Sequence, residues 1–352
     1  MRRFVPLTLL ALLLAGCATP AKAADEIVVG VSLELSGPTA SIGTASRRAL
    51  ELKARQLNAS GVLGGRRLEL VVKDNRTDNN TSVANINDLI KNDHADAVIT
   101  GGCSQCTLAA VPAITENRVP TVSLAAAGAV TSPVRDRRYV FKTTQTPGQD
   151  AQLITDELVR RGVTRVGVVA VSNIYGQEGQ QEFTRRARAA GVDVAETEQF
   201  GQADADMTIQ VSKIVAARPR AVVVWAVSPA APIVVRELRA AHYTGEIYLG
   251  AGAGPEVTAE GVHLAFPKTL AGAEGAYSGF ASFAADALQL IAGAVVTTGG
   301  TDRERLRAAI ENARLDGING PLRFSAEDHS GLRSDALGIL TFEQGRWVLT
   351  SS

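Results

Sequence analysis

The first half of the chain alternates short β-branched runs with amphipathic stretches. Apolar runs at 27–33, 66–74, 95–101 and 119–127 have the length and composition of strands. Stretches with helical spacing follow the first three of these runs, at 46–61, 80–93 and 106–118. Regular strand-helix alternation at this spacing favours a parallel sheet that is covered by helices on both faces. The pattern therefore predicts an α/β fold.

The alternation starts again after residues 139–152. Further strands are predicted at 165–173, 192–200, 221–227 and 246–252, with helices at 152–162, 177–191, 207–219 and 231–245. The tail differs, because it has two helices at 282–300 and 302–314 before short strands at 320–325 and 336–350. This second alternation mirrors the first. It indicates two similar α/β lobes, which the tail completes by crossing between them more than once.

The first 24 residues have the pattern of an export signal. Arg2 and Arg3 precede an apolar stretch that is too short to span a bilayer as an anchor. Two cleavage sites fit: Leu-Ala-Gly-Cys at 14–17, which resembles a lipobox and would make Cys17 the lipidated first residue, and Ala-Lys-Ala at 21–23, which resembles an ordinary signal-peptidase site. We favour the lipobox. Either site predicts an exported protein, in the periplasm or on the cell surface.

Charge and length limit the partners. The 352 residues include 36 basic and 36 acidic side chains, so the formal net charge is zero. A balanced charge argues against nucleic acid or an anionic membrane surface as the main partner. The length is sufficient for two domains with cores of their own.

Cys103 and Cys106 form a C-x-x-C motif between a predicted strand and a predicted helix. Redox dithiols occupy such places, whereas a zinc site needs about four ligands and the four histidines are scattered. Disulfides persist outside the cytoplasm. If Cys17 carries lipid, these two cysteines can pair only with each other within the chain. A local disulfide or two unpaired thiols is the interpretation we favour, with no metal and no cofactor.

Candidate binding residues lie at the carboxyl ends of the predicted strands, where open α/β sheets bind ligands. Ser104 and Thr107 follow one strand, and the small residues at 125–127 end the next. Tyr175 follows a strand of the second lobe and would reach a cleft, or else lie half-buried on the surface. The chain lacks a G-x-S-x-G motif, and nothing in it requires catalysis. We therefore predict that it is not an enzyme.

Several segments, in order, resemble the leucine/isoleucine/valine-type periplasmic substrate-binding proteins of ABC importers. The resemblance begins with VGVSLELSGPTASIGTASRRALELKARQLNASGVLGGRRLELVVKDNRTD and continues through AVITGGCSQCTLAAVPAITENRVPTVSLAAA, VGVVAVSNIYGQEGQQEF and DMTIQVSKI. It implies two doubly wound Rossmann-like lobes joined by a multi-strand hinge. On this basis residues 25–145 and about 274–318 form the first lobe, and 146–273 and about 319–352 form the second.

The resemblance also implies a binding site. Ser104 would hydrogen-bond a carboxylate of the ligand, Ala125 and Ala127 would line the pocket through their backbone, Ile42 would touch the ligand's side chain, and Tyr175 would contribute from the second lobe. Aimed N–H and O–H dipoles can hold a carboxylate in a dry cleft without an arginine.

The site departs from the family's pattern in the acid that pairs with a ligand's ammonium. Ala251 and Gly252 stand at the position expected for that acid, and Glu256 lies further along. A buried unpaired ammonium is costly. Either Glu256 or another acid such as Glu34 takes this role, or the ligand has no ammonium.

The resemblance implies that the protein delivers a small polar ligand, an amino acid, an amide or an organic acid, to an ABC permease in the inner membrane, as a monomer. A second hypothesis is a sensor module that presents its bound form to a membrane receptor. A third, an exported thiol-disulfide enzyme, would depend on Cys103 and Cys106.

Overall fold

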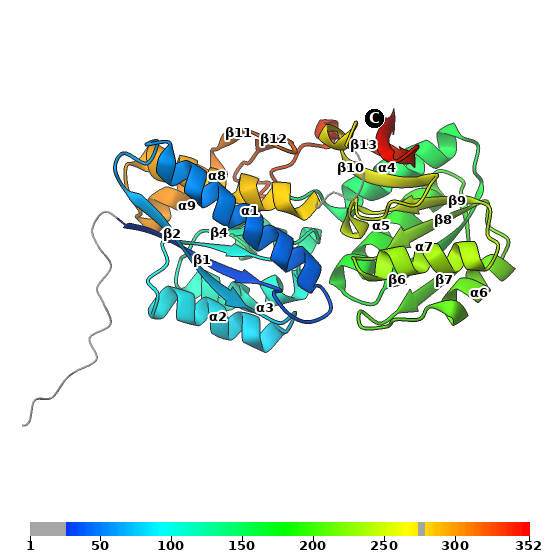
Figure 1. Cartoon of the computed structure of the whole chain (residues 1–352), viewed down its shortest axis with the longest axis horizontal. Coiled ribbons are helices and arrows are strands. Elements are labelled where there is room, and N and C mark those ends of the chain that lie inside the picture. The colour runs from blue at the N-terminus through cyan, green and yellow to red at the C-terminus, as the bar shows by residue number, and fades with distance from the viewer. Residues whose placement is uncertain (1–25, 274–278) are drawn as a thin grey trace, which may run out of the picture.

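The computed structural model describes residues 26–273 and 279–352, which form two α/β lobes side by side (Figure 1). The predicted export signal and its Cys17 lie outside the described residues. Each lobe is built around its own sheet, and helices cover both faces. The predicted fold class of two doubly wound lobes is confirmed, because the structure contains two separate, largely parallel sheets.

The first lobe contains a five-stranded parallel sheet in the order β2-β1-β3-β4-β5. Strands β1 and β3 are almost wholly buried because helices pack on both faces of the sheet. Its elements are β1 (Glu26–Leu33), α1 (Ala40–Ala59), β2 (Arg67–Asp74), α2 (Asn79–Lys91), β3 (Ala97–Thr100), α3 (Ser104–Glu116), β4 (Thr121–Ser123), the 3-10 turns η1 (Gly128–Val130) and η2 (Val134–Asp136), and β5 (Val140–Lys142).

Helix α1 begins at Ala40, six residues before the predicted start at residue 46. The polar residues of this turn suggested a loop. The structure instead buries Ile42 and Gly43 against the end of β1, and this packing outweighs the weak local propensity for helix. The strand predicted at 119–127 is also shorter, since β4 ends at Ser123 and the small residues after it form a loop.

The second lobe contains a seven-stranded sheet in the order β14-β13-β10-β9-β8-β6-β7. Strands β6 to β10 are parallel, and β13 and β14 add an antiparallel edge. Its elements are α4 (Pro147–Arg160), β6 (Arg165–Val171), α5 (Ile174–Ala189), β7 (Asp193–Phe200), α6 (Thr208–Ala216), β8 (Ala221–Trp225), α7 (Ala230–Ala240), β9 (Glu246–Leu249), η3 (Ala251–Ala253), β10 (Val262–Pro267), η4 (Lys268–Leu270), η5 (Ser334–Ala336), β13 (Leu337–Glu343) and β14 (Arg346–Ser351).

After η4 the chain returns to the first lobe. Helix α8 (Gly279–Thr298) packs beside α1, and α9 (Arg303–Glu311) packs against α8 (Figure 1). The small sheet of β11 (Arg314–Gly317) and β12 (Gly320–Arg323) follows. The next segment runs along β5, where the His329 carbonyl accepts a hydrogen bond from the backbone N–H of Lys142. The chain then enters the second-lobe sheet at β13. The residue bounds predicted for the two lobes, including the boundary near residue 319, stay a prediction.

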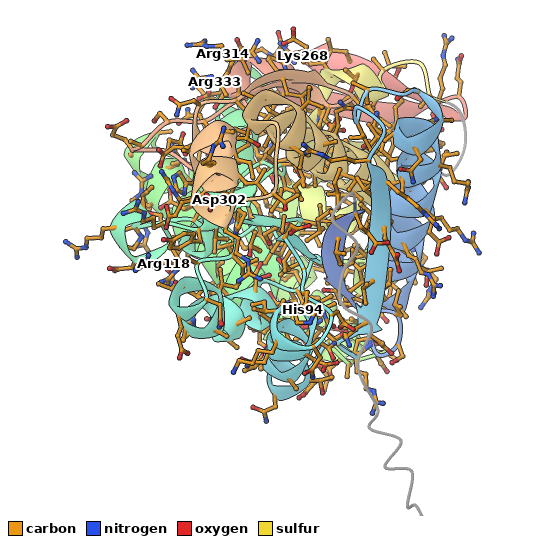
Figure 2. The ribbon with its side chains drawn as sticks, turned by 90° about the vertical axis from the view of Figure 1, so that its left-hand side faces the viewer. His94, Arg118, Lys268, Asp302, Arg314 and Arg333 are labelled. Atoms are coloured by element: carbon orange, nitrogen blue, oxygen red, sulfur yellow. A yellow bond between two sulfur atoms is a disulfide. The ribbon has the colours of Figure 1, made fainter. Side chains whose placement is uncertain are left out.

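Helix α8 is long and apolar enough to cross a membrane by length and composition alone. In the structure, however, 78% of that window is buried inside the protein. The helix lies against α1 and the first-lobe sheet, so its apolar surface forms part of the hydrophobic core. By contrast, side chains of both charge signs, such as Arg118, Asp302 and Arg314, lie on the outer end of the first lobe (Figure 2).

Candidate functional site

A pocket lies between the two lobes, at the carboxyl ends of the central strands. It is a hollow of about 470 Å³, part of which is open to solvent. The first lobe lines it with polar groups of Glu34, Thr39, Ser104 and Gln105 and with the apolar surfaces of Ile42, Ala126 and Phe280. The second lobe adds Asn173, Tyr175, Gln202, Val227 and Gly252.

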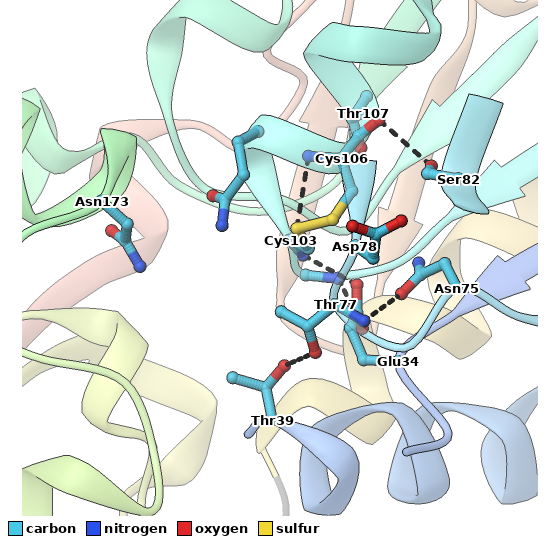
Figure 3. The surroundings of a disulfide bond; sticks show 12 residues. Glu34, Thr39, Asn75, Thr77, Asp78, Ser82, Cys103, Cys106, Thr107 and Asn173 are labelled. Carbon is cyan, nitrogen blue, oxygen red and sulfur yellow. Dashed lines mark hydrogen bonds between the residues drawn. A yellow bond between two sulfur atoms is a disulfide. The ribbon is translucent and has the colours of Figure 1, made fainter. Parts of the chain in front are cut away.

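The first-lobe wall is built where β3 turns into α3. Cys103 is the N-cap of this helix, and its sulfur accepts a hydrogen bond from the Cys106 N–H at 3.2 Å. A disulfide joins Cys103 to Cys106 across one helical turn (Figure 3). Ser104 is therefore the first residue of a braced helix. Its hydroxyl accepts a hydrogen bond from the Ala127 N–H at 3.3 Å and still has a proton to donate.

Glu34 lies beneath this helix start (Figure 3). Its carboxylate accepts hydrogen bonds from the Cys103 N–H at 2.9 Å and the Gly102 N–H at 3.2 Å. Burial raises the pKa of Glu34, and these backbone donors together with the Asn75 side chain partly oppose the shift. Gly101 allows the close approach, because a Cβ there would come within 2.4 Å of the Glu34 carboxylate.

The second-lobe wall is formed by the start of α5 and the turn after β9. Asn173 caps α5 by accepting from the Gly176 N–H at 3.0 Å. The hydroxyl of Tyr175 accepts from the Gly252 N–H at 2.8 Å, which fixes the ring against that turn. Burial raises the pKa of Tyr175 well above its usual value, so the phenol stays neutral and can donate its proton.

The structure places three of the predicted ligand-binding residues in the pocket lining: Ile42, Ser104 and Tyr175. Thr107 is buried behind the wall, where its hydroxyl bonds that of Thr100 at 2.9 Å. Their roles toward a ligand stay predictions.

The other predicted ligand-binding residues are not among those that line the pocket. Ala125 and Ala127 flank the lining residue Ala126, and both are fully buried. The carboxylate of Glu256 lies beside Gly254 rather than in the pocket lining, whereas Glu34 does line the pocket. Of the three small residues at 125–127, Ala126 is therefore the one that lines the pocket.

Several other lining residues were not predicted from the sequence pattern. Gln105 and Gln202 meet across the cleft, with the Gln105 amide donating to Gln202 at 3.3 Å. Gln202 follows β7 in a polar loop, and the polar sequence of this loop predicts only that it lies on the surface. Phe280 lies in the first turn of α8, and its place in the pocket depends on the chain's return to the first lobe.

Buried charges lie behind the pocket, at the crossing from β5 to α4. The ammonium of Lys142 donates to the carbonyl oxygens of Ala126 and Gln145, and burial lowers its pKa to about 8. Asp150 accepts from the Ala251 N–H at 2.9 Å, and burial raises its pKa to about 7. The nearby charges of Asp150 and Glu178 favour the charged form of Lys142.

One carboxylate joins the two lobes. Both oxygens of Glu178 in α5 accept from the Gly128 N–H in η1, each at 2.9 Å. Together with the Gln105–Gln202 hydrogen bond, this contact holds the lobes in a closed arrangement over the pocket. Within the described residues there is no group of three or more His, Cys, Asp or Glu side chains that could hold a metal ion.

A family model described as "Periplasmic binding protein" matches residues 26–279. The chain belongs to this family. It is a family of binding proteins and not of enzymes, and the predicted resemblance is confirmed. Two curated relatives from Pseudomonas aeruginosa are a leucine-, isoleucine-, valine-, threonine- and alanine-binding protein, 26% identical over 206 residues, and an amino acid binding protein, 27% identical over 218 residues. The matches cover 58% and 61% of this chain but only 54% and 57% of those relatives.

Solved structures of periplasmic binding proteins share the fold over nearly the whole chain. An extracellular ligand-binding receptor from Rhodopseudomonas palustris superimposes with a TM-score of 0.83 at 24% identity, covering 94% of this chain and 100% of that one. A solute-binding protein of an ABC transporter from the same organism, in complex with benzoate, gives 0.82 at 23% identity and covers 93% and 96%. A branched-chain amino acid transporter substrate-binding protein from Streptococcus pneumoniae, in complex with isoleucine, gives 0.81 at 21% identity and covers 93% and 100%.

Proposed function

We propose that this periplasmic binding protein captures a small polar ligand between its lobes and delivers it to an ABC permease in the inner membrane. The observation that supports the proposal is a pocket whose lining comes from both lobes, with Ser104 on one wall and Tyr175 on the other. A ligand that touches both walls stabilises the closed arrangement relative to any open one.

The connections between the lobes suit such closure. The chain passes between them at the residues after β5, between η4 and α8, and between β12 and β13. Few segments thus join two lobes that each have a core of their own. A hinge of this kind lets the lobes separate for ligand entry and close around the ligand with little internal change.

The ligand class follows from the relatives and from the pocket. One relative is named for binding leucine, isoleucine, valine, threonine and alanine, and two structural neighbours hold isoleucine and benzoate. We propose an amino acid, an amide or a small organic acid for this chain, bound by a monomer. We also propose that lipid on Cys17 tethers the protein to the membrane, where it meets the permease.

A thermal-shift screen tests the proposed function. The purified chain would be melted with each of the twenty amino acids, small amides, amines, and aliphatic and aromatic acids. A ligand that binds only the folded form at about 100 times its Kd adds about 2.7 kcal/mol of stability. We expect a saturable rise in Tm with at least one compound. If no compound of any of these classes raises Tm, the chain does not bind this type of ligand.

A further inference from the structure

Backbone N–H groups of the pocket lining are available to a ligand. Within the described residues, the N–H groups of Ser104, Gln105 and Ala126 have no acceptor. The first two belong to the opening turn of α3, where N–H groups have no intrahelical partner and the helix dipole is positive. The third belongs to the peptide group whose carbonyl oxygen, that of Ala125, accepts from the Thr144 hydroxyl at 2.8 Å, and this polarises the N–H as a donor.

Side chains of the lining add further donors. The hydroxyl groups of Ser104 and Tyr175 each accept from a backbone N–H and keep their own proton. The amide oxygen of Gln202 accepts from the side-chain amides of Gln105 at 3.3 Å and Asn173 at 3.2 Å, which leaves the NH2 group of Gln202 to donate. Both walls therefore present donors to the pocket.

Acceptors of the lining are, by contrast, largely in use. Carbonyl oxygens of three lining residues accept from the protein itself: Ala126 from the Lys142 ammonium, Val227 from the Ala231 N–H at 3.2 Å and Gly252 from the Ser228 N–H at 3.3 Å. The side-chain oxygen of Asn173 accepts from the Gly176 N–H. An ammonium has three N–H groups to satisfy, and few acceptors of the described lining remain for it, chiefly the amide oxygen of Gln105.

The acid of the lining is satisfied by the first lobe. Glu34 is the only acidic or basic side chain among the described lining residues, and it is 1% exposed. Its carboxylate accepts from the N–H groups of Gly102, Cys103 and Glu34 itself and from the Asn75 side chain. A carboxylate offers about four acceptor positions on its two oxygens. These four donors fill them, so Glu34 has no position left for a ligand's ammonium.

The rest of the lining is mainly apolar. Ile42 and Phe280 line the pocket from the first lobe, and Val227 lines it from the second. An ionised amino group loses its water in such surroundings, and this is costly without an acid to pair with it. An aliphatic or aromatic body gains free energy there by leaving water.

We propose that this pocket takes carboxylic acids that have an apolar body and no cationic amino group. The inference rests on the proposed function and narrows its ligand class. The family resemblance already implies that Ser104 holds a carboxylate. The new claim concerns the rest of the ligand: the described lining has many donors for an anion and no free acid for an ammonium, so an amino acid binds more weakly than the matching acid.

Matched sets of ligands test the inference on the unmodified chain at pH 7. Each set keeps one carbon skeleton: 4-methylpentanoate, leucine and 3-methylbutylamine; 3-phenylpropanoate, phenylalanine and 2-phenylethylamine; and propanoate, alanine and ethylamine. We expect at least one acid to raise Tm and to bind in calorimetry. Its amino acid should bind at least about tenfold more weakly, and its amine should not bind, because neither can place its ammonium beside a free acid.

The outcomes separate the two proposals. An amino acid or an amine that binds as tightly as its matched acid, or more tightly, would overturn the exclusion of the ammonium and leave the proposed function intact. If none of these compounds binds and none of the wider thermal-shift screen does, the proposed function fails and this inference fails with it.

A variant pair tests the missing acid directly. Asn173→Asp keeps the oxygen that caps α5 and adds a carboxylate to the lining, so it should weaken binding of the acid and strengthen binding of the amino acid. We expect the ratio of their Kd values to move toward the amino acid by on the order of tenfold. Asn312→Asp, which adds an acid at the exposed end of α9, is the matched control and should leave the ratio unchanged.

An unchanged ratio in a folded Asn173→Asp, or the same change in both variants, would contradict the assignment. The ligand sets decide the inference on the parent protein even if Asn173→Asp does not fold.

Discussion

Ser104 lies in the pocket lining and has a hydroxyl group that can hydrogen-bond a ligand. It starts α3, lines the pocket, and accepts the Ala127 N–H while keeping its own proton for another acceptor. The disulfide beside it fixes the first turn of the helix, and Cys106 is buried on the inner side of that turn. The hydroxyl is therefore held in place before any ligand arrives, and this reduces the ordering cost of binding.

Replacing this hydroxyl gives the first prediction. Ser104→Ala should weaken binding of the ligand found in the screen by on the order of tenfold, because a hydrogen bond worth about 1.5–3 kcal/mol to a charged group, or somewhat less to a neutral one, is lost. Isothermal titration of both proteins measures the difference. An unchanged Kd would show that Ser104 does not contact the ligand.

The sequence predicted Ser104, Ile42 and Tyr175 as binding residues, and the structure places all three in the lining. Strand ends in an open α/β sheet face one edge, so Ser104 and Tyr175, which follow strands, are readily identified, whereas Ile42 was named only through the family resemblance. Gln202 and Phe280 were missed because their positions depend on how the lobes meet and on the return of α8. A local pattern carries no information on either.

Helices α1 and α5, at corresponding places in the two lobes, each have a glycine that allows close packing against the end of a strand. Gly43 in α1 and Gly176 in α5 each lie in the first helical turn after a central strand. A Cβ at Gly43 would come within 2.1 Å of the Glu34 carbonyl oxygen, and one at Gly176 within 2.0 Å of the Val171 carbonyl oxygen. Each glycine lets the helix start approach the strand end, and so brings the helix residues next to it toward the pocket.

This close packing predicts a stability difference between two Gly→Ala substitutions. Gly43→Ala should destabilise the fold by about 1–3 kcal/mol, because the methyl group has no space beside backbone atoms that cannot move independently. Gly293→Ala, in the middle of α8 with no atom within 4 Å of the new Cβ, should instead stabilise it by up to about 1 kcal/mol. Urea unfolding measures both. If the two variants were equally stable, the close contact at Gly43 would not hold in solution.

Among the elements, strands were easier to predict than helix starts. Runs such as Val28–Val29 and Val222–Val224 are apolar on both faces because helices cover both sides of each sheet. The start of α1 was predicted too late because its first turn is polar and contains glycine, and only contact with β1 makes it helical. Strand β12 was predicted within 320–325, but its partner β11 was not, since Arg314 ends a helical pattern and Arg314–Gly317 becomes a strand only by pairing.

On the scale of the whole molecule, two side-chain contacts between the described residues link the lobes across the cleft, away from the hinge. The contact between Glu178 and the Gly128 N–H is the shorter of two direct side-chain links described above, and Glu178 does not line the pocket. A contact that exists only in the closed form adds its free energy to ligand affinity without touching the ligand. Glu178 is therefore expected to control how long the ligand stays bound.

Removing the charge at this contact tests the expectation. Glu178→Gln should weaken ligand binding roughly threefold to tenfold, mainly through faster dissociation, because a charge-assisted hydrogen bond becomes a neutral one. Glu182→Gln, one turn further along α5, removes an acid that pairs with Arg185 and should leave dissociation unchanged. Stopped-flow displacement gives the rates. Equal dissociation rates in the parent and both variants would exclude a role for Glu178 in closure.

The most direct test of ligand capture between the lobes is to fill the pocket from within. Gly102 lines it, and a Cβ there would meet only a methyl group of Ile42 at 3.5 Å, so a larger side chain can enter the pocket without a backbone clash. Isothermal titration of the parent and Gly102→Leu with the ligand from the screen is the decisive measurement. We predict one-to-one binding by the parent and a loss of at least tenfold in affinity in a variant that melts at a similar temperature. Equal affinity in both proteins would show that the ligand binds elsewhere and would contradict the account.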